Sequence, residues 1–167
     1  KELEQNYDKT NVILSNNIGM GAGNNLGIIK SSTQYVYVLN PDVMLKEDTL
    51  SSINNSISDL KNFAILSPVS DNSDYPNYKI SKKSISINKD IIENVEEIDG
   101  YSMIINKNFF SNNNFFDERI FMYLENVDLC LRAKKNGGKL FIAKNSKIHH
   151  LGAKAVDDRY SKEIELS

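Results

Sequence analysis

The stretch Tyr35-Val36-Tyr37-Val38-Leu39-Asn40-Pro41-Asp42 is an uncharged run of strand-forming residues that stops at a turn and a carboxylate. Such a run predicts a strand covered on both faces of a sheet. Pro41 ends the strand, because proline has no N–H group to donate to a neighbouring strand. Asn40 and Asp42 are therefore expected just beyond a buried strand, where open α/β sheets bind their ligands.

Two further polar groups lie far along the chain. Glu125, Asn126 and Asp128 open a helical pattern that ends at Gly137-Gly138, and His149-His150 follow a later apolar run. Carboxylates and imidazoles at three separate positions predict one site that holds a divalent cation and a general base. Asp42 offers the oxygen ligand that Mg²⁺ or Mn²⁺ prefers, although Asn-Pro-Asp is also a common turn sequence.

The rest of the pattern alternates strands and helices within 167 residues, a length that suits one domain. This alternation predicts an α/β fold with a mainly parallel sheet flanked by helices. Besides 35–39, the predicted strands are 12–14, 63–66, 102–105 and 140–143, and the predicted helices are 24–30, 47–61 and 123–136. The aromatic residues Phe115, Phe116 and Phe121 are mostly expected in the core, and the alternative for them is a sugar-binding surface.

The composition of the chain limits what the protein is expected to bind and where it is expected to work. The 20 Lys and Arg residues are matched by 22 Asp and Glu residues, which gives no reason to expect nucleic-acid binding. The single Cys130 excludes an intramolecular disulfide and suits a reducing cytoplasm. No apolar run approaches the ~18 residues of a membrane-spanning helix.

The glycine-rich stretch from Asn16 to Gly27 could bring backbone amides close to a phosphate at a helix N-terminus. It lacks Gly-Lys-Ser/Thr, which excludes a P-loop, and the alternative is a loop that needs positive φ angles. The motifs that follow residues 40–42 are Gly100-Tyr101-Ser102-Met103, Phe116-Asp117-Glu118, Tyr123 to Arg132, and His150-Leu151-Gly152. In their order and spacing, from about Asn11 to Gly152, these motifs resemble a family 2 glycosyltransferase of the rhamnosyltransferase-like branch.

The resemblance implies a glycosyltransferase A-type fold that transfers a sugar, with rhamnose as one candidate, from a nucleotide diphosphate sugar to a glycan or lipid-linked glycan acceptor. The transfer would invert the anomeric centre. The implied setting is polysaccharide biosynthesis for the cell envelope, in the cytoplasm at the inner face of the cell membrane, with peripheral membrane association. Because the family places a nucleotide-binding βα unit before the glycine-rich stretch, residues 1–167 are expected to be a single, N-terminally truncated domain that lacks this unit.

The resemblance also implies a set of site residues. Donor binding falls to Asn17, Gly19, Asn24, Asn25, Asn40 and Asp42. Asp117 and Glu118 border the acceptor side, and Asp42 and His150 hold the divalent cation, Mg²⁺ or Mn²⁺. Glu125 and Asp128 are the catalytic candidates.

Asn126 departs from the family pattern, in which an aspartate at this position is usually credited as the base. An amide cannot accept the proton, so the role passes to Glu125 or Asp128, which share a helix face. The alternative for Asp128 is an i,i+4 ion pair with Arg132, worth about 0.3–0.5 kcal/mol. Two other interpretations remain open: a non-catalytic remnant or sugar-nucleotide-binding module, and a glycoside hydrolase that uses Asp42 and an acid from residues 125–128.

Overall fold

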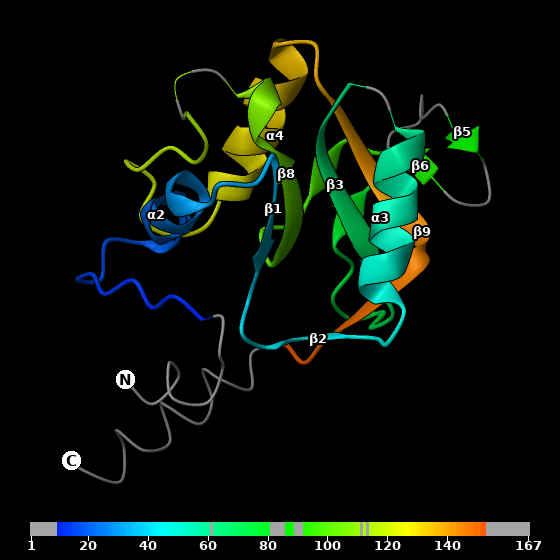
Figure 1. Ribbon diagram of the computed structural model, residues 1–167, viewed down its shortest axis with the longest axis horizontal. Helices are drawn as coiled ribbons and strands as arrows, with labels where there is room; N and C mark the ends of the chain where they lie inside the picture. The colour runs from blue at the N-terminus through cyan, green and yellow to red at the C-terminus, as the bar shows by residue number, and fades with distance from the viewer. Residues whose placement is uncertain are drawn as a thin grey trace, which may run out of the picture.

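The computed structural model describes residues 10–60, 62–80, 86–88, 92–110, 112 and 114–152 (Figure 1). Within these ranges the helices are α2 (Met20–Lys30), α3 (Thr49–Asp59) and α4 (Glu125–Lys135), and a short 3₁₀ turn, η1, spans Lys107–Phe109. None of the described helices is long and apolar enough to cross a membrane.

The described strands form one seven-stranded sheet and one separate pair. The order across the main sheet is β1 (Tyr35–Leu39), β8 (Ser102–Asn106), β3 (Phe63–Ser70), β9 (Lys139–His150), β6 (Ile92–Asn94) and β5 (Ser86–Asn88). Strand β2 (Val43–Leu45) pairs with the last residues of β9. The separate pair consists of β4 (Tyr78–Lys79) and β7 (Glu97–Ile98).

The main sheet is mixed, so the α/β class is confirmed but the expectation of a mainly parallel sheet is wrong. Strands β3 and β9 are parallel, whereas β8 runs antiparallel to both β1 and β3, and β6 runs antiparallel to β9. A parallel neighbour needs a long crossover, usually a helix. Between β3 and β8 the described residues contain only short strands and no helix, and β8 accordingly returns in the opposite direction.

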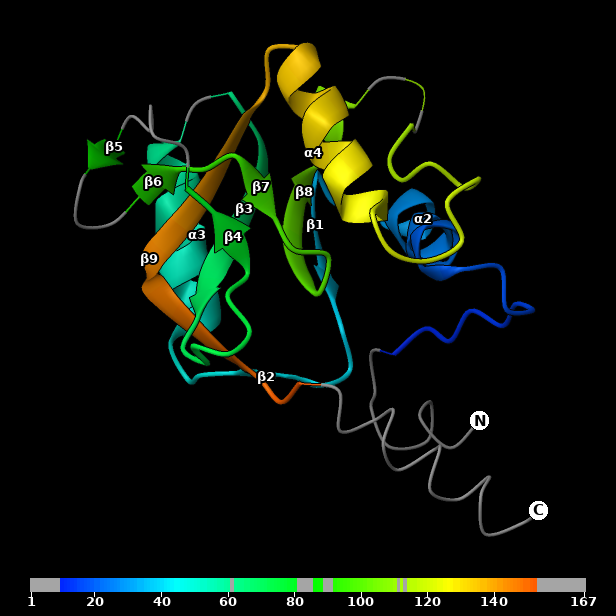
Figure 2. The ribbon, with the colours of Figure 1, turned by 180° about the vertical axis from the view of Figure 1, so that it is seen from behind.

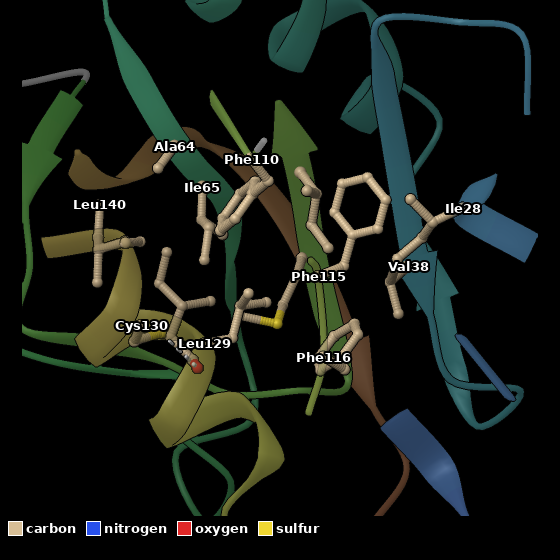
Figure 3. Packing of buried hydrophobic residues seen from close by; sticks show 14 of the residues in the cluster. Ile28, Val38, Ala64, Ile65, Phe110, Phe115, Phe116, Leu129, Cys130 and Leu140 are labelled. Carbon is tan, nitrogen blue, oxygen red and sulfur yellow. Dashed lines mark hydrogen bonds between the residues drawn. The ribbon is translucent and has the colours of Figure 1, made fainter. Parts of the chain in front are cut away.

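Apolar side chains cover both faces of the central strands. Ile65 belongs to a cluster that includes Leu129 and Cys130 of α4 (Figure 3). Leu66, the next residue in the same strand, belongs to a second cluster that includes Ile53 of α3. Successive side chains of a strand point to opposite faces, so α3 covers one face of the sheet and α4 the other, as the two opposite views in Figures 1 and 2 show.

Several predicted elements are confirmed, and the strand predicted at residues 12–14 is wrong. Strand β1 spans the predicted residues, and α3 and α4 lie within their predicted ranges. Residues 12–14 form no strand, and Leu14 is 91% exposed, because no described strand pairs with them. Phe115 and Phe116 are buried as predicted, whereas Phe121 is 53% exposed and lies outside the core.

The strand directions bring several polar segments to one edge of the sheet. Because β8 is antiparallel to both of its neighbours, β1, β3 and β9 all run the same way and their carboxyl ends lie at one edge. Asn40 and Asp42 follow β1 there, and His150 ends β9. The Asp99-Gly100-Tyr101 segment, which leads into the antiparallel β8, arrives at the same edge.

Candidate functional site

A pocket of about 590 Å³ lies at this edge. Its walls come from five separate parts of the chain: Asn40 after β1, Asp74–Pro76 after β3, Asp99–Tyr101 before β8, Tyr123–Val127 at the start of α4, and His150 at the end of β9. Met20, Lys79 and Glu97 complete the lining. The structure therefore brings Asn40, Glu125 and His150, which the sequence singled out separately, into one pocket.

His150 is held tightly at the pocket wall. Its Nε2 atom lies 3.2 Å from Oδ2 of Asp42. The Tyr101 ring stacks on the imidazole at 4.0 Å between centroids, and the Tyr75 ring meets it edge-on at 5.3 Å. Tyr101 is fixed in turn, because its hydroxyl donates to the Tyr75 carbonyl at 2.6 Å, and burial raises its pKa to about 12. The imidazole is thus enclosed by two rings, with Asp42 beside its Nε2 atom, and its Nδ1 atom is buried without a hydrogen-bond partner in the described part of the protein.

Packing explains why position 152, the last residue of the His150-Leu151-Gly152 motif, is a glycine. Gly152 has a φ of +68°, and a Cβ atom there would overlap the Tyr75 ring that packs against His150.

His149 contacts different residues from His150. Its Nδ1 atom lies 2.6 Å from Oδ1 of Asp71, and Asp71 also pairs with Lys46 at 2.9 Å. The hydrogen bond from Lys46, and then that to His149, lower the pKa of Asp71. Of the two histidines, only His150 lines the pocket.

Asp42 and His150 fit a divalent cation. Their facing atoms are 3.2 Å apart, close to the ~3 Å expected between adjacent ligands of an octahedral ion at 2.0–2.1 Å. The second oxygen of Asp42 is buried and finds no hydrogen-bond partner in the described part of the protein. No group of three His, Cys, Asp or Glu side chains suited to a metal occurs among the described residues. The protein would therefore supply two ligands, and substrate oxygens and water the others, as is usual for Mg²⁺.

Glu125 is a buried carboxylate at the first residue of α4. It is 3% exposed, and its Oε2 atom finds no hydrogen-bond partner in the described part of the protein. The helix N-terminus favours a negative charge there. Leu124 before it has a φ of +71°, a strained conformation that is concentrated at functional sites. Gly100 lies against this helix start, since a Cβ atom there would lie 3.5 Å from Oε1 of Glu125.

Asp128 makes the ion pair that was its alternative in the sequence. Its Oδ2 atom accepts from Nε of Arg132 at 2.7 Å, and Asp128 does not line the pocket of Glu125. The same guanidinium donates to the carbonyls of Asn114 and Phe115. Arg132 therefore ties α4 to the preceding loop, and Asp128 holds Arg132 in place.

Replacing Asp128 by asparagine is expected to lower the free energy of unfolding by about 1 kcal/mol, through the lost ion pair and the lost charge in the first turn of α4. Arg132→Ala is expected to destabilise more, because two carbonyls also lose their donor. Urea unfolding followed by circular dichroism measures both changes. An Asp128→Asn protein as stable as the wild type would contradict this account.

The glycine-rich stretch becomes the start of α2. Gly19, with a φ of +93°, precedes the helix, and the Met20 amide donates to the Phe121 carbonyl at 3.0 Å. Asn17 accepts from the Gly19 amide at 3.4 Å. Asn24 is partly buried, and its amide nitrogen finds no partner in the described part of the protein.

Asn25 serves the fold in this structure. Its amide nitrogen donates to the Phe116 carbonyl at 2.9 Å and to Glu118 at 3.0 Å, and its oxygen accepts from the Phe116 amide at 3.0 Å. Asn25 is 3% exposed. These bonds fasten α2 to the 116–118 segment and use the whole amide, so Asn25 is not brought to the wall that carries Asn40.

Asp117 and Glu118 lie in a different pocket, of about 570 Å³, together with Asn25 and Arg119. Asp117 pairs with Arg119 at 2.6 Å, and this hydrogen bond lowers the pKa of Asp117 to about 2. The two predicted acceptor-side residues are therefore not brought together with Asn40, Glu125 and His150.

Sequence reasoning missed Asp99, Tyr75 and Tyr101. Asp99 lines the main pocket, and loss of hydration against the pocket wall, followed by the charge of Glu97, raises its pKa. The available signal was its place directly before Gly100, the first residue of the 100–103 motif; in the structure Asp99 lies in the short connection between β7 and β8. The family models and the curated proteins compared with this chain give no match.

Proposed function

We propose that this protein transfers a sugar from a nucleotide diphosphate sugar to a hydroxyl group of a glycan or lipid-linked glycan, with inversion, on a glycosyltransferase A-type fold. The observation that carries the proposal is the pocket at the sheet edge. Asn40, Gly100, Glu125 and His150 belong to four separate motifs of the resemblance, and all four line that pocket. Unrelated turns and helix starts would have no reason to converge there.

The donor side of the reaction lies around Asp42 and His150. These side chains would hold the divalent cation, which would offset the negative charge that develops on the departing diphosphate. Tyr101 and Tyr75 keep the imidazole from turning away. Asn40, beside them on the pocket wall, would hydrogen-bond the donor sugar or ribose.

The acceptor side lies toward α4. A single inverting displacement needs a carboxylate that receives the acceptor proton while the hydroxyl oxygen attacks the anomeric carbon. Of the two carboxylates predicted for this role, Glu125 lies at the pocket, whereas Asp128 is engaged by Arg132. Asp128 therefore serves the stability of α4 in this proposal.

A non-catalytic sugar-nucleotide-binding module is the second candidate, and Asn126 favours it. The Asn126 amide donates to the Ile98 carbonyl at 3.2 Å, so this side chain is part of the packing between α4 and β7. An amide in that place cannot act as a base.

Acceptor-dependent release of nucleoside diphosphate separates these functions. The protein would be incubated with Mn²⁺ and a panel of nucleotide diphosphate sugars, with and without glycan acceptors, and the released diphosphate and the glycan mass would be measured. Release that requires an acceptor, with a matching increase in glycan mass, is expected. Binding without release would indicate the binding module, and glycan cleavage without any nucleotide would indicate a hydrolase.

A further inference from the structure

We propose that Asp99 is the carboxylate that takes the proton from the acceptor hydroxyl. This inference rests on the proposed function and names the residue that completes it. It starts from the absence of a base at two expected positions. Asn126 has no basic group, and Asp128 forms an ion pair with Arg132 and does not line the pocket. Either Glu125 or another pocket carboxylate must therefore receive the proton.

Glu125 is poorly placed to touch an acceptor. Only 3% of the residue is exposed, and its Oε2 atom is closed off from solvent. A base must come within hydrogen-bond reach of the hydroxyl it deprotonates. Asp99, by contrast, is exposed and lines the same pocket.

Asp99 lies next to the position where the family places its base. Gly100, the following residue, packs on the start of α4, and a Cβ atom on it would lie 3.4 Å from Cβ of Asn126 and 3.5 Å from Oε1 of Glu125. The backbone of Asp99 therefore runs beside Asn126 on the pocket wall. A carboxylate on this neighbouring segment can compensate for the amide at position 126.

The carboxylate of Asp99 also has no cationic partner among the described residues. Two other carboxylates at or beside the pocket do have one: Glu97 pairs with Lys79 at 2.8 Å, and Asp42 contacts His150. The charged groups that face Asp99 from the surrounding elements are Glu97 and Lys79 of the β4–β7 pair, His150 of β9, Glu125 of α4 and Asp74 after β3. None of them neutralises Asp99 by direct contact, so its carboxylate is available to a substrate.

The backbone holds Asp99 firmly. Its amide donates to the Asn77 carbonyl at 2.8 Å, and Asn77 is itself fully buried. The Asn77 side chain donates to the Pro68 carbonyl at 2.6 Å and accepts from the Ser70 amide at 2.9 Å, which ties this segment to the end of β3. A base fixed in this way needs little rearrangement before reaction.

The step balances without a further reactant. The acceptor oxygen forms a bond to the anomeric carbon, and its proton passes to the Asp99 carboxylate. The bond between the anomeric carbon and the phosphate oxygen breaks, and its electron pair leaves with the nucleoside diphosphate. Asp99 then returns the proton to solvent, to which its exposed side chain has access.

Side-by-side kinetics of Asp99→Asn and Glu125→Gln test the assignment, because each change removes a charge and keeps the shape. Asp99→Asn is expected to lower kcat about 10²–10⁴-fold, the usual contribution of a positioned base, with donor affinity unchanged. Glu125→Gln is expected to lower it less than tenfold. Asp59→Asn, which changes an exposed carboxylate at the end of α3, serves as the matched control and should retain wild-type turnover.

The pH dependence gives a readout that a merely structural role would not move. The rate should fall as acid protonates Asp99, and the raised pKa of this carboxyl places that fall at a higher pH than for an ordinary aspartate. Glu97→Gln removes the like charge and frees Lys79, and both changes lower the pKa of Asp99. The acidic limb of the rate profile should therefore move to lower pH in Glu97→Gln.

The outcomes separate this inference from the proposed function. A large loss in Glu125→Gln or Asp74→Asn, with Asp99→Asn near wild type, would overturn the role of Asp99 and leave sugar transfer standing. An unmoved acidic limb in Glu97→Gln would also count against it. If the wild-type protein releases no diphosphate with any acceptor, the proposed function itself fails.

Discussion

Alanine in place of Asp42 is expected to abolish the increase in nucleoside diphosphate affinity that Mn²⁺ produces in the wild-type protein. Asp42 is the one carboxylate in contact with His150 in the described part of the chain, and its second oxygen is buried without a partner. Disturbing even the residues that support a metal ligand typically costs 10–100-fold in metal affinity, so losing a ligand should cost at least about that much. Without the ion, the diphosphate charge meets a pocket lined with carboxylates.

Calorimetric titration of UDP and dTDP, with and without Mn²⁺, measures this effect. His150→Ala should behave as Asp42→Ala does, whereas His149→Ala provides a matched control, because His149 faces Asp71 and does not line the pocket. Wild-type affinity that is the same with and without the ion would contradict the metal role. An equal loss in the two histidine variants would show that the choice of His150 is wrong.

Gly19→Ala is expected to destabilise the fold by roughly 2–4 kcal/mol, whereas Gly23→Ala, four residues later, is expected to stabilise it by up to about 1 kcal/mol. Gly19 has a φ of +93°, and a Cβ atom there would overlap the carbonyl oxygen of Phe121. Backbone on both sides of this contact would have to move. Gly23 is exposed within α2 and has open space around its Cβ position, so alanine only removes unfolded-state freedom.

Thermal unfolding distinguishes the two changes. At roughly 2–4 °C per kcal/mol for a chain of this size, Gly19→Ala should melt about 5–15 °C below the wild type and Gly23→Ala slightly above it. Gly27→Ala repeats the control, because its Cβ position is also open. Equal melting temperatures for Gly19→Ala and Gly23→Ala would mean that the glycine before α2 and the glycine within it are interchangeable, against the geometry described.

The sequence carried enough information to locate strand β1 and helix α3. The uncharged run 35–39 became β1, because β-branched and aromatic residues favour strands. The expectation that it is covered on both faces is wrong, since β1 is the edge strand of the described sheet and Val38 is its one buried residue. The helical spacing of residues 47–61 likewise produced α3, which packs one apolar stripe on the sheet. Both signals are local, so no knowledge of the neighbouring strands was needed.

Strand direction depended on information that is not local. The strand–helix alternation predicted parallel neighbours, but residues 71–98 include short strands, and β8 enters the sheet antiparallel between β1 and β3. A strand of two or three residues gives little periodic signal. Which strand such a short segment pairs with, and in which direction, depends on the strands that the rest of the fold places beside it.

The difference between Glu125 and Asp128 likewise depends on the tertiary structure and not on the local sequence. Their spacing of three residues puts both on one face of α4, and nothing in the sequence ranks them. Arg132, held by two carbonyls of the preceding loop, attracts Asp128, while Glu125 lies at the pocket against Gly100. The tertiary position of one arginine therefore decides which of these two acids lies at the pocket.

By itself, the sequence located strands β1, β3, β8 and β9, the helices, and the residue types around a sheet edge, because hydrophobic periodicity and turn chemistry act within a few residues. Only the tertiary structure decided which polar groups meet. It placed Asp42 on His150, Asn25 on the 116–118 segment, and Gly100 beside Asn126. These contacts join residues from 26 to 108 positions apart in the chain. The packing of the whole sheet, rather than any local preference, brings such residues together.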